Sequence, residues 1–319
     1  MPAWLPPAFT APCRKPQTDA PLIGNRHAVR KQAKYRHFLG FGADGNEGRI
    51  TRVSATGQGL ANRRQAGLPD KGVQIDLNSD VGESIGDDEG VMPFVSSANI
   101  ACGFHAGNPQ IMRSTAQLAQ SLGVAIGAHP SFQDRDGFGR REMQITTDEL
   151  ENLVAYQIGA LATVAVALGT RLSHVKPHGA LYNMAARDAS MAGAIARAVQ
   201  AVDPSLVLFG LSGSQLVLAG ERSGLRVASE VFADRGYMPD GSLAPRGTPG
   251  AVLTSVADVA QRAVAMATGQ GVVSVDGTTI RVKADTICIH GDTPGAAALA
   301  GAVRAALNGA GIRVVFPGR

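Results

Sequence analysis

Residues 97–129 read SANIACGFHAGNPQIMRSTAQLAQSLGVAIGAH, and this stretch contains one complete unit of the fold. Two short apolar runs, 98–101 and 124–128, have the composition of buried β-strands. The segment between them, 108–122, carries apolar residues at helical spacing. A strand, a helix and a second strand in this order predict two parallel strands that are joined by a crossover helix.

The same alternation continues from residue 73 to the end of the chain. Seven or eight strand–helix units in about 245 residues predict an α/β fold, a TIM-like (β/α) barrel of seven or eight strands. Asp276-Gly277 lies between two short β-rich runs and predicts a small antiparallel hairpin insertion. The other expected strands are 73–77, 173–176, 206–209, 227–231, 286–289 and 312–316, and the other expected helices are 147–169, 185–201, 212–223, 255–268 and 294–310.

The first 72 residues differ in composition from the rest of the chain. They hold 12 Lys/Arg and 4 Asp/Glu without a sustained apolar pattern, whereas residues 73–319 hold 18 and 22. We expect residues 1–72 to be a disordered basic extension or the product of an over-long gene model, and residues 73–319 to be a catalytic barrel. Because the barrel region is mildly acidic, the overall charge of +4 does not indicate a nucleic-acid partner.

The cysteines indicate the cellular compartment, and one uncharged segment raises the question of a membrane span. Cys13, Cys102 and Cys288 are too few and too far apart for a disulfide scaffold, which favours a reducing, cytoplasmic compartment. Residues 152–170 carry no charge but include polar side chains such as Gln157. We therefore expect a helix that packs against the barrel rather than a membrane span.

Polar and ionisable side chains collect where the expected strands end. The carboxyl ends of barrel strands meet on one face, so these side chains are expected to line one pocket. Four carboxylate or amide side chains within residues 76–83 suit a divalent cation or the polar end of a substrate. The whole set is Asp76, Asn78, Asp80, Glu83, Asn99, Cys102, His105, His129, Asp134, Lys176, His178, Tyr182, Glu230, Asp234, Arg235, His290 and Asp292.

Three kinds of residue in this set leave alternatives open. His105 and His129 either satisfy local carbonyls, or act as general acid and base, or bind Zn²⁺ together with Asp76. Lys176 lies on a strand that we expect to be buried, so it needs a substrate carboxylate, a phosphate or a pocket acid as its partner. Cys102 is either a packed thiol or a nucleophile.

Standard motifs for several enzyme classes are absent from the sequence. It contains no Gly-x-x-x-x-Gly-Lys-Ser/Thr loop, so any nucleotide is not held by a standard P-loop. The Gly-x-Ser-x-Gly elbow of serine hydrolases and the His-Glu-x-x-His motif of zinc proteases are absent as well.

Six motifs, taken in order, resemble those of the LamB/YcsF family and together cover essentially all of residues 73–317. Asn108 and Gln133 stand where the family often has Asp and Pro. The motifs are IDLNSDVGE (75–83), SANIACGFHAG (97–107), GAHPSF (127–132), VKPHGALYN (175–183), EVFADR (230–235) and HGD (290–292).

The resemblance implies a barrel related to the glycoside hydrolase/deacetylase group. It also implies the A component of a prokaryotic ATP-dependent 5-oxoprolinase, which opens the lactam of 5-oxo-L-proline to L-glutamate while ATP is cleaved to ADP and phosphate. The implied cofactor is ATP with Mg²⁺, and the implied partners are the 5-oxoprolinase subunits B and C, with no nucleic acid and no membrane. Two alternatives stay open: a stand-alone metal-dependent deacetylase or amidohydrolase, and a non-catalytic component that only binds the lactam.

Within this expectation we assign catalytic roles to Lys176, His105, His129 and Asp80. Lys176 would neutralise the oxyanion or a phosphate, and the two histidines would transfer protons. Asp80 would contact Mg²⁺ or polar groups of the substrate, together with Asp76 and Glu83 from the substrate-binding set. His178 and Arg235 would hold the carboxylate of the substrate. The expected substrate-binding set is Asp76, Asn78, Glu83, Asn99, His178, Tyr182, Glu230, Asp234, Arg235, His290 and Asp292.

Overall fold

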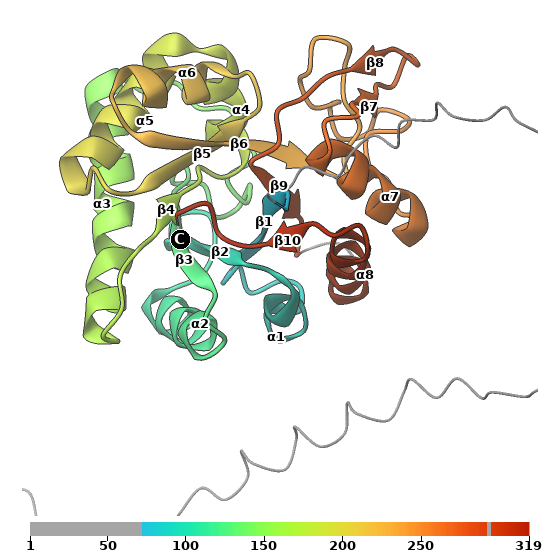
Figure 1. Cartoon of the computed structure of the whole chain (residues 1–319). Coiled ribbons are helices and arrows are strands. Elements are labelled where there is room, and N and C mark those ends of the chain that lie inside the picture. The colour runs from blue at the N-terminus through green and yellow to red at the C-terminus, as the bar shows by residue number, and fades with distance from the viewer. Residues whose placement is uncertain (1–71, 292–294, 319) are drawn as a thin grey trace, which may run out of the picture. The chain divides into compact units, whose positions relative to one another are not determined.

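A computed structural model describes residues 72–291 and 295–318 of the chain (Figure 1). Residues 1–71, on which the expectation of a disordered extension rests, lie outside these ranges. Asp292, from the expected substrate-binding set, lies outside them as well. The described part contains a parallel barrel surrounded by helices, as Figure 1 shows.

Seven parallel strands close the barrel, because the last of them pairs with the first. In spatial order they are β1 (Gln74–Val81), β2 (Ser97–Ala101), β3 (Ala125–His129), β4 (His174–Val175), β5 (Val207–Leu211), β6 (Arg226–Phe232) and β9 (Thr286–Ile289). Strand β9 pairs in parallel with both β6 and β1, which completes the ring. The prediction of a TIM-like barrel is confirmed, with seven strands.

The eighth expected strand forms but is not a member of the ring. Strand β10 (Arg313–Val314) pairs only with Gln74 and Ile75 at the start of β1, before β2 begins its own pairing with β1 at Asn78. Phe316, just after β10, packs with the apolar side chains that fill the base of the barrel. The apolar run 312–316 therefore closes the amino-terminal end of the barrel.

The helices lie outside the ring and include the predicted ones, but the short helical segments within 88–94 were not expected, and the helix expected to begin at residue 185 begins at Gly179. It is also interrupted. The predicted helix 185–201 is two helices, because Asp188 is extended and its side chain caps the second one by accepting from the amides of Ser190 and Met191. The helices are α1 (Asp88–Val91) with the 3₁₀ turn η1 (Met92–Phe94), α2 (Pro109–Ser121), α3 (Thr147–Ala167), α4 (Gly179–Arg187), α5 (Ala189–Val202), α6 (Gln215–Arg222), α7 (Val256–Ala267) and α8 (Ala296–Gly309).

Helix α3 contains most of the uncharged segment. Within the described ranges it is the one helix that is long and apolar enough to cross a membrane. It begins with a capping box formed by Thr146 and Glu149 and packs against α5 and β3. One of its faces is buried, including Leu150, Val154 and Ile158. The prediction of a helix that packs against the barrel is confirmed.

The hairpin insertion is present between β6 and β9. Strands β7 (Val272–Val273) and β8 (Thr279–Ile280) are antiparallel and lie beside α7 (Figure 1). The turn depends on Asp276, whose carboxylate accepts from the Ser274 hydroxyl and the Thr278 amide. Gly277 follows with a φ of 89°, a conformation that favours glycine.

Candidate functional site

The interior of the barrel changes from apolar to polar along its axis. At the base, His174 stacks on Phe209 with ring centroids 4.4 Å apart. Its Nε2 lies 2.7 Å from the Oδ1 of Asn99, which can only accept, so this nitrogen donates. Burial, together with the nearby Lys176, lowers the pKa of His174 to about 3, so the ring is neutral. His174 therefore links the apolar base to the polar layer above it.

Asp76 lies in this lower polar layer and not beside the histidines. The hydroxyls of Ser96, Ser97 and Thr286 all donate to its carboxylate, at 2.6 to 2.7 Å. Burial raises the pKa of Asp76 to about 6. The structure therefore does not bring Asp76 together with His105 and His129 as a metal-ligand set, because three hydroxyls already surround its oxygens.

Lys176 occupies the centre of the polar interior. Its Nζ lies 2.9 Å from Asp80 Oδ1, 2.8 Å from Glu230 Oε1 and 3.1 Å from the Sγ of Cys288. Burial alone would lower its pKa, but Asp80, Cys288 and Glu230 outweigh burial and hold the pKa well above the ordinary value. Lys176 is therefore charged, and its anionic partners are two acids of the barrel interior.

Two asparagines fix the positions of this lysine and of its two acidic partners through hydrogen bonds. The amide nitrogen of Asn99 donates to Asn78 Oδ1 and to Asp80 Oδ1, both at 2.8 Å. The amide nitrogen of Asn78 donates to Glu230 Oε1 at 3.0 Å, and its oxygen accepts from Lys176. Both asparagines are completely buried. They position the charged groups from below and do not face the cavity.

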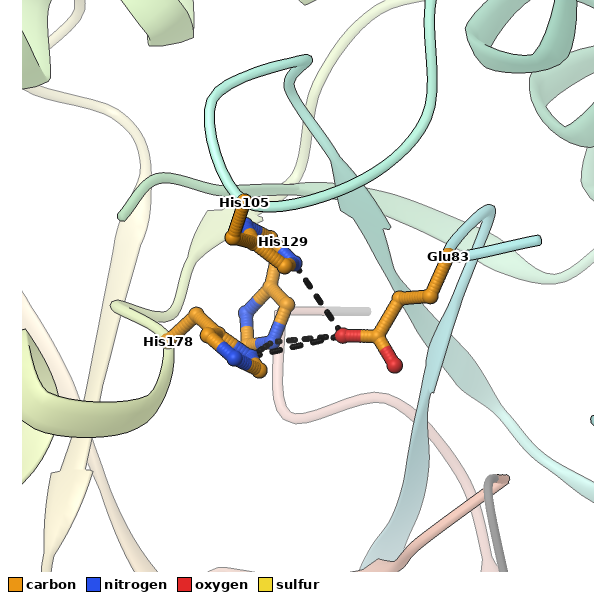
Figure 2. Close-up of side chains that lie close together, drawn as sticks. All are labelled: Glu83, His105, His129 and His178. Carbon is orange, nitrogen blue, oxygen red and sulfur yellow. Dashed lines mark hydrogen bonds and ion pairs between the residues drawn. The ribbon is translucent and has the colours of Figure 1, made fainter. Parts of the chain in front are cut away.

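Four side chains from four different segments converge above this layer (Figure 2). Glu83 follows β1, His105 follows β2, His129 ends β3, and His178 immediately precedes α4. The Oε1 of Glu83 lies 3.1 Å from His105 Nε2, 3.3 Å from His178 Nδ1 and 3.9 Å from His129 Nε2. The predicted convergence of His105 with His129 is confirmed, and Glu83 and His178 complete the group.

The electrostatics keep two of these imidazoles neutral. Burial, followed by the neighbouring His129, lowers the pKa of His178 to about 3. Burial, followed by His178 and His129, lowers the pKa of His105 further. His129 Nε2 and Lys176 together outweigh burial at Asp80, and they hold its pKa well below the ordinary value. A neutral imidazole presents one nitrogen lone pair, which can bind a metal ion or accept a proton.

The loop that follows β3 supports this group, and its residues 137–139 were not among those expected in the site. Phe138 has a φ of 54° and Gly139 a φ of 65°, and the carbonyl of Phe138 lies 2.9 Å from His178 Nε2. A Cβ at Gly139 would lie 2.9 Å from His105 Cβ and from His178 Cδ2, so only glycine allows this approach. The sequence signal was the Gly-Phe-Gly run at 137–139.

Asp134 fixes the shape of the same loop. Its carboxylate accepts from the backbone amide of Gly137 at 3.0 Å and from the guanidinium of Arg141. The positive φ of Phe138 is thus imposed by the loop, and strained residues of this kind occur where a side chain or carbonyl must be aimed. Asp134 holds the loop and through it the carbonyl that contacts His178.

A cavity of about 1100 Å³ opens above the polar layers. Its wall includes the segments 211–214 and 238–246, and Phe232 forms part of its side. The predicted site residues that line it are Asp80, Glu83, His129, Lys176, His178, Tyr182, Arg235 and His290. Asp76, Asn78, Asn99, His105, Glu230 and Asp234 are buried but do not line it. The expected single pocket is present, and part of the expected binding set supports it from behind.

Two residues of the cavity wall are engaged in contacts that fix the wall itself. Arg235 donates to the carbonyls of Ala251 and Ala244 at 3.0 and 2.7 Å. His290 Nδ1 lies 2.8 Å from the carboxylate of Asp234. Burial would raise the pKa of Asp234, but His290 and Arg235 outweigh it and lower this pKa. Arg235 therefore orders a loop at the rim, although we had expected it to hold the substrate carboxylate.

Cys102 and Asn108 have local structural roles. The thiol of Cys102 contacts the carbonyl of Ile100 at 3.3 Å, and burial raises its pKa to about 12, so it is a packed thiol and not a nucleophile. Asn108 caps α2, because its side-chain oxygen accepts from the amide of Ile111 at 3.0 Å. Asparagine and aspartate cap helices about equally well, so Asn108 does not disturb the site.

Comparison with known proteins gives a consistent result over the barrel. Residues 75–318 match the model of the LamB/YcsF family. The A component of the 5-oxoprolinase of Tolumonas auensis is 56% identical over 246 residues, which are 76% of this chain and 98% of that protein. The protein of the same name from Heliobacterium modesticaldum is 56% identical over 247 residues, 76% of this chain and 97% of that protein.

A similar protein has a solved structure. The crystal structure of the lactam utilization protein from Thermus thermophilus aligns with a TM-score of 0.72 and 47% sequence identity. The alignment covers 76% of this chain and 99% of that chain. The similarity in sequence and in structure therefore extends over the barrel as a whole.

Proposed function

The chain belongs to the LamB/YcsF family, and from that premise we propose that it is the A component of an ATP-dependent 5-oxoprolinase. The reaction is the hydrolysis of the lactam of 5-oxo-L-proline to L-glutamate, coupled to the cleavage of ATP to ADP and phosphate. The names of its relatives support this proposal, since those proteins are more than half identical to the chain over nearly their whole length. The partners are then two further subunits, B and C.

The chemistry of a lactam defines what such a site has to supply. The amide is stabilised by resonance and its nitrogen is a poor leaving group, so water attacks it slowly. Coupling to ATP indicates that the amide oxygen is phosphorylated or otherwise activated before water attacks. The site then needs a cation for the developing negative charge and a donor of a proton to the departing nitrogen.

The observation that carries the proposal is the position of Lys176 at the floor of the cavity. Its charged amine lines the cavity and is held on two sides by Asp80 and Glu230. A buried amine fixed in this way is preorganised to neutralise an oxyanion or a phosphoryl oxygen. The cavity of about 1100 Å³ exceeds the volume of a five-membered lactam, which leaves room for a phosphate-bearing co-substrate.

Proton transfer is best assigned to the histidines that reach the cavity. His129 and His178 line it, and the His129 Nε2 lies 3.0 Å from the His178 Nδ1 and 3.3 Å from Asp80. His105 is buried behind them and contacts Glu83. We therefore assign proton transfer to His129 with His178, and a supporting role to His105 in place of the pairing expected from the sequence.

The test is the release of glutamate from 5-oxo-L-proline by the full chain, with and without subunits B and C and with and without Mg-ATP. We expect turnover only when all three subunits and ATP are present. An assembled complex that remains inert with ATP, or one that releases glutamate equally well without ATP, would contradict the proposal.

A second function is favoured by one observation, the group of three histidines and Glu83 beside the cavity. Such a group suits a stand-alone, metal-dependent amide hydrolase that needs no nucleotide. Hydrolysis of N-acetyl or cyclic amides by the chain alone, lost on chelation and restored by metal, would favour this second function.

A further inference from the structure

We infer that Glu83, His129 and His178 bind one divalent transition-metal ion at the mouth of the barrel, with His105 positioning the carboxylate of Glu83. The inference goes beyond the proposed function, since it concerns an ion held by the chain's own side chains whether or not ATP is hydrolysed. It also limits one assignment made above: His129 and His178 transfer protons only while no ion is bound to them, because a nitrogen that binds a metal has no free lone pair. The three ligands line the cavity, and His105 does not.

The hydrogen bonds of His129 and His178 fix where their lone pairs lie. His129 Nδ1 lies 2.7 Å from the backbone carbonyl of Lys176, and His178 Nε2 lies 2.9 Å from the backbone carbonyl of Phe138. A carbonyl can only accept, so each of these nitrogens carries the hydrogen. When both rings are neutral, the lone pairs are therefore on His129 Nε2 and on His178 Nδ1.

His129 Nε2 and His178 Nδ1 lie 3.0 Å apart, so two neutral rings would direct their lone pairs at each other. The Oδ2 of Asp80 lies 3.3 Å from His129 Nε2 and favours a proton or a cation at this nitrogen. Two acceptors at this distance repel each other unless a cation or an additional proton lies between them. The rings are nearly perpendicular, with an interplanar angle of 86°, so both can direct their lone pairs toward one ion. A backbone carbonyl behind each ring is the usual arrangement that orients a metal-binding histidine.

The carboxylate of Glu83 completes a three-ligand set. Its Oε1 lies 3.3 Å from His178 Nδ1 and 3.9 Å from His129 Nε2. Ligands about 2.0–2.1 Å from a tetrahedral Zn²⁺ ion are separated from one another by roughly 3.3 Å. The observed separations of 3.0, 3.3 and 3.9 Å bracket that value, so small shifts of the side chains are enough.

His105 does not fit as a fourth ligand. Its ring is parallel to that of His178, with centroids 3.8 Å apart and an interplanar angle of 5°. An imidazole binds a metal in the plane of its ring, and one ion cannot lie in two parallel planes. His105 Nε2 lies instead 3.1 Å from Glu83 Oε1, where it donates a hydrogen bond that orients the carboxylate.

Two histidines and one carboxylate, open on the fourth side to a cavity, suit a particular class of ion. Imidazole with carboxylate favours Zn²⁺ or Co²⁺, whereas Mg²⁺ prefers oxygen ligands alone. The ion is therefore distinct from the Mg²⁺ that accompanies ATP. When bound, such an ion polarises a carbonyl or lowers the pKa of a bound water.

The direct test is metal binding by the full chain after removal of metals with a chelator. Co²⁺ titration followed by its visible absorption, and metal analysis after equilibration with Zn²⁺, should show one ion per chain. If the chain binds neither ion at up to about 100 µM, the inference is wrong, and a proton shared between His129 and His178 occupies the place of the metal.

Variants separate the ligands from the positioning residue. His129→Gln and His178→Gln should each lower Co²⁺ affinity by more than about 100-fold, and His105→Phe, which keeps an aromatic ring in the stack, by about 10- to 100-fold. Asn183→Ala is the matched control, because Asn183 lines the same cavity and belongs to neither group of side chains that could hold a metal ion. Co²⁺ affinity that survives both glutamine variants in a folded chain would overturn the ligand assignment.

The metal test and the test of the proposed function can fail independently. Co²⁺ and Zn²⁺ binding is measured on the chain alone, without ATP or 5-oxo-L-proline. A chain that binds the ion but gives no ATP-dependent glutamate with its partners supports this inference and contradicts the proposed function. A chain that binds no ion but gives ATP-dependent glutamate with its partners supports the proposed function and contradicts this inference.

Discussion

The two ends of the barrel are built from the same strands but differ in what fills them. At the amino-terminal end, the interior consists of the apolar side chains Ala125, Val207, Phe209, Ala228 and Phe316. At the carboxyl-terminal end, it consists of charged and titratable groups around Lys176 and the histidines. The polar layer between them, with Asp76, Asn78, Asn99 and His174, is buried and joined by hydrogen bonds.

The difference shows how one fold separates stability from chemistry. Buried apolar groups stabilise the folded chain without direction, and buried polar groups are tolerated only when they are paired. The base therefore supplies stability, and the mouth holds a costly arrangement of charges that is useful for catalysis. Substitutions at the mouth should therefore affect turnover as well as stability, whereas substitutions at the base should affect stability alone.

The largest effect is expected at the mouth, from Lys176→Met. Turnover in the complex should fall at least ~100-fold, as it does when a single oxyanion donor is removed from an enzyme. Stability should fall as well, by roughly 3–5 kcal/mol, because Asp80 and Glu230 lose the cation between them. Glutamate release and urea unfolding measure the two effects.

Lys283→Met is the control for this variant. Lys283 is largely exposed and pairs with Asp285, so its removal should change stability by less than about 1 kcal/mol and leave turnover unchanged. Turnover of Lys176→Met within a fewfold of the wild type would remove Lys176 from the catalytic machinery.

At the base, Phe316→Ala should lower stability by a similar amount but leave turnover per folded chain nearly unchanged. Deleting a buried aromatic ring costs about 3–5 kcal/mol in the free energy of unfolding, measured by urea denaturation. Turnover per folded chain should remain within a fewfold, because Phe316 is separated from the cavity by the polar layer. Phe316→Leu should lower the free energy of unfolding by less than Phe316→Ala does, because leucine fills part of the space of the ring. A loss of turnover that exceeds the loss of folded protein would show that the two ends are coupled.

In the polar layer between the two ends, Asp76 should make the free energy of unfolding depend on pH. The carboxyl of Asp76 has a pKa of about 6 in the folded chain, against 3.8 for an ordinary aspartate, because of burial. The folded chain thus binds this proton more tightly, so its free energy of unfolding falls as pH rises from about 4 through 6. The fall amounts to roughly 3 kcal/mol for a shift of about two pH units.

Asp76→Asn should remove that part of the slope. Urea unfolding of both proteins between pH 4 and 7.5 gives the difference curve, which isolates Asp76 from the other titrating groups. Parallel curves for the two proteins would mean that Asp76 does not titrate in this range.

The smallest effect is expected in the outer helices, away from both ends. Asp188→Ala removes the cap of α5 and should cost about 1 kcal/mol, with unchanged turnover. Asp188→Asn, which also caps, should restore most of this stability. A large effect on turnover would show that α4 and α5 transmit strain to His178 at the start of α4.

The repeating part of this fold was predictable from the sequence. Alternating short β-rich runs and helical patterns specify a parallel barrel, and polar side chains at the strand ends specify the face of the site. The place of β10 was not predictable, because a buried apolar run has the same composition whether it belongs to the ring or closes its base. The break at Asp188 was not predicted, because the apolar spacing is helical on both sides of this residue and only its cap contacts end one helix and begin the next.

The candidate site was predictable as a set of residues but not as a geometry. Chain order placed Lys176, Asp80 and His129 on one face, and their contacts confirm that they meet. The sequence could not distinguish Asp76 from Glu83 as the acid beside the histidines. That choice depends on which way each strand residue points and on a loop with two positive φ angles at Phe138 and Gly139.

The most direct test of the account is the stoichiometry of the reaction in the assembled complex of this chain with subunits B and C. Glutamate and inorganic phosphate are measured together, for the wild type and for Lys176→Met. The account predicts one phosphate for each glutamate in the wild type, and loss of glutamate formation in the variant. Glutamate formed without phosphate release, or formed at the wild-type rate by Lys176→Met, would contradict it.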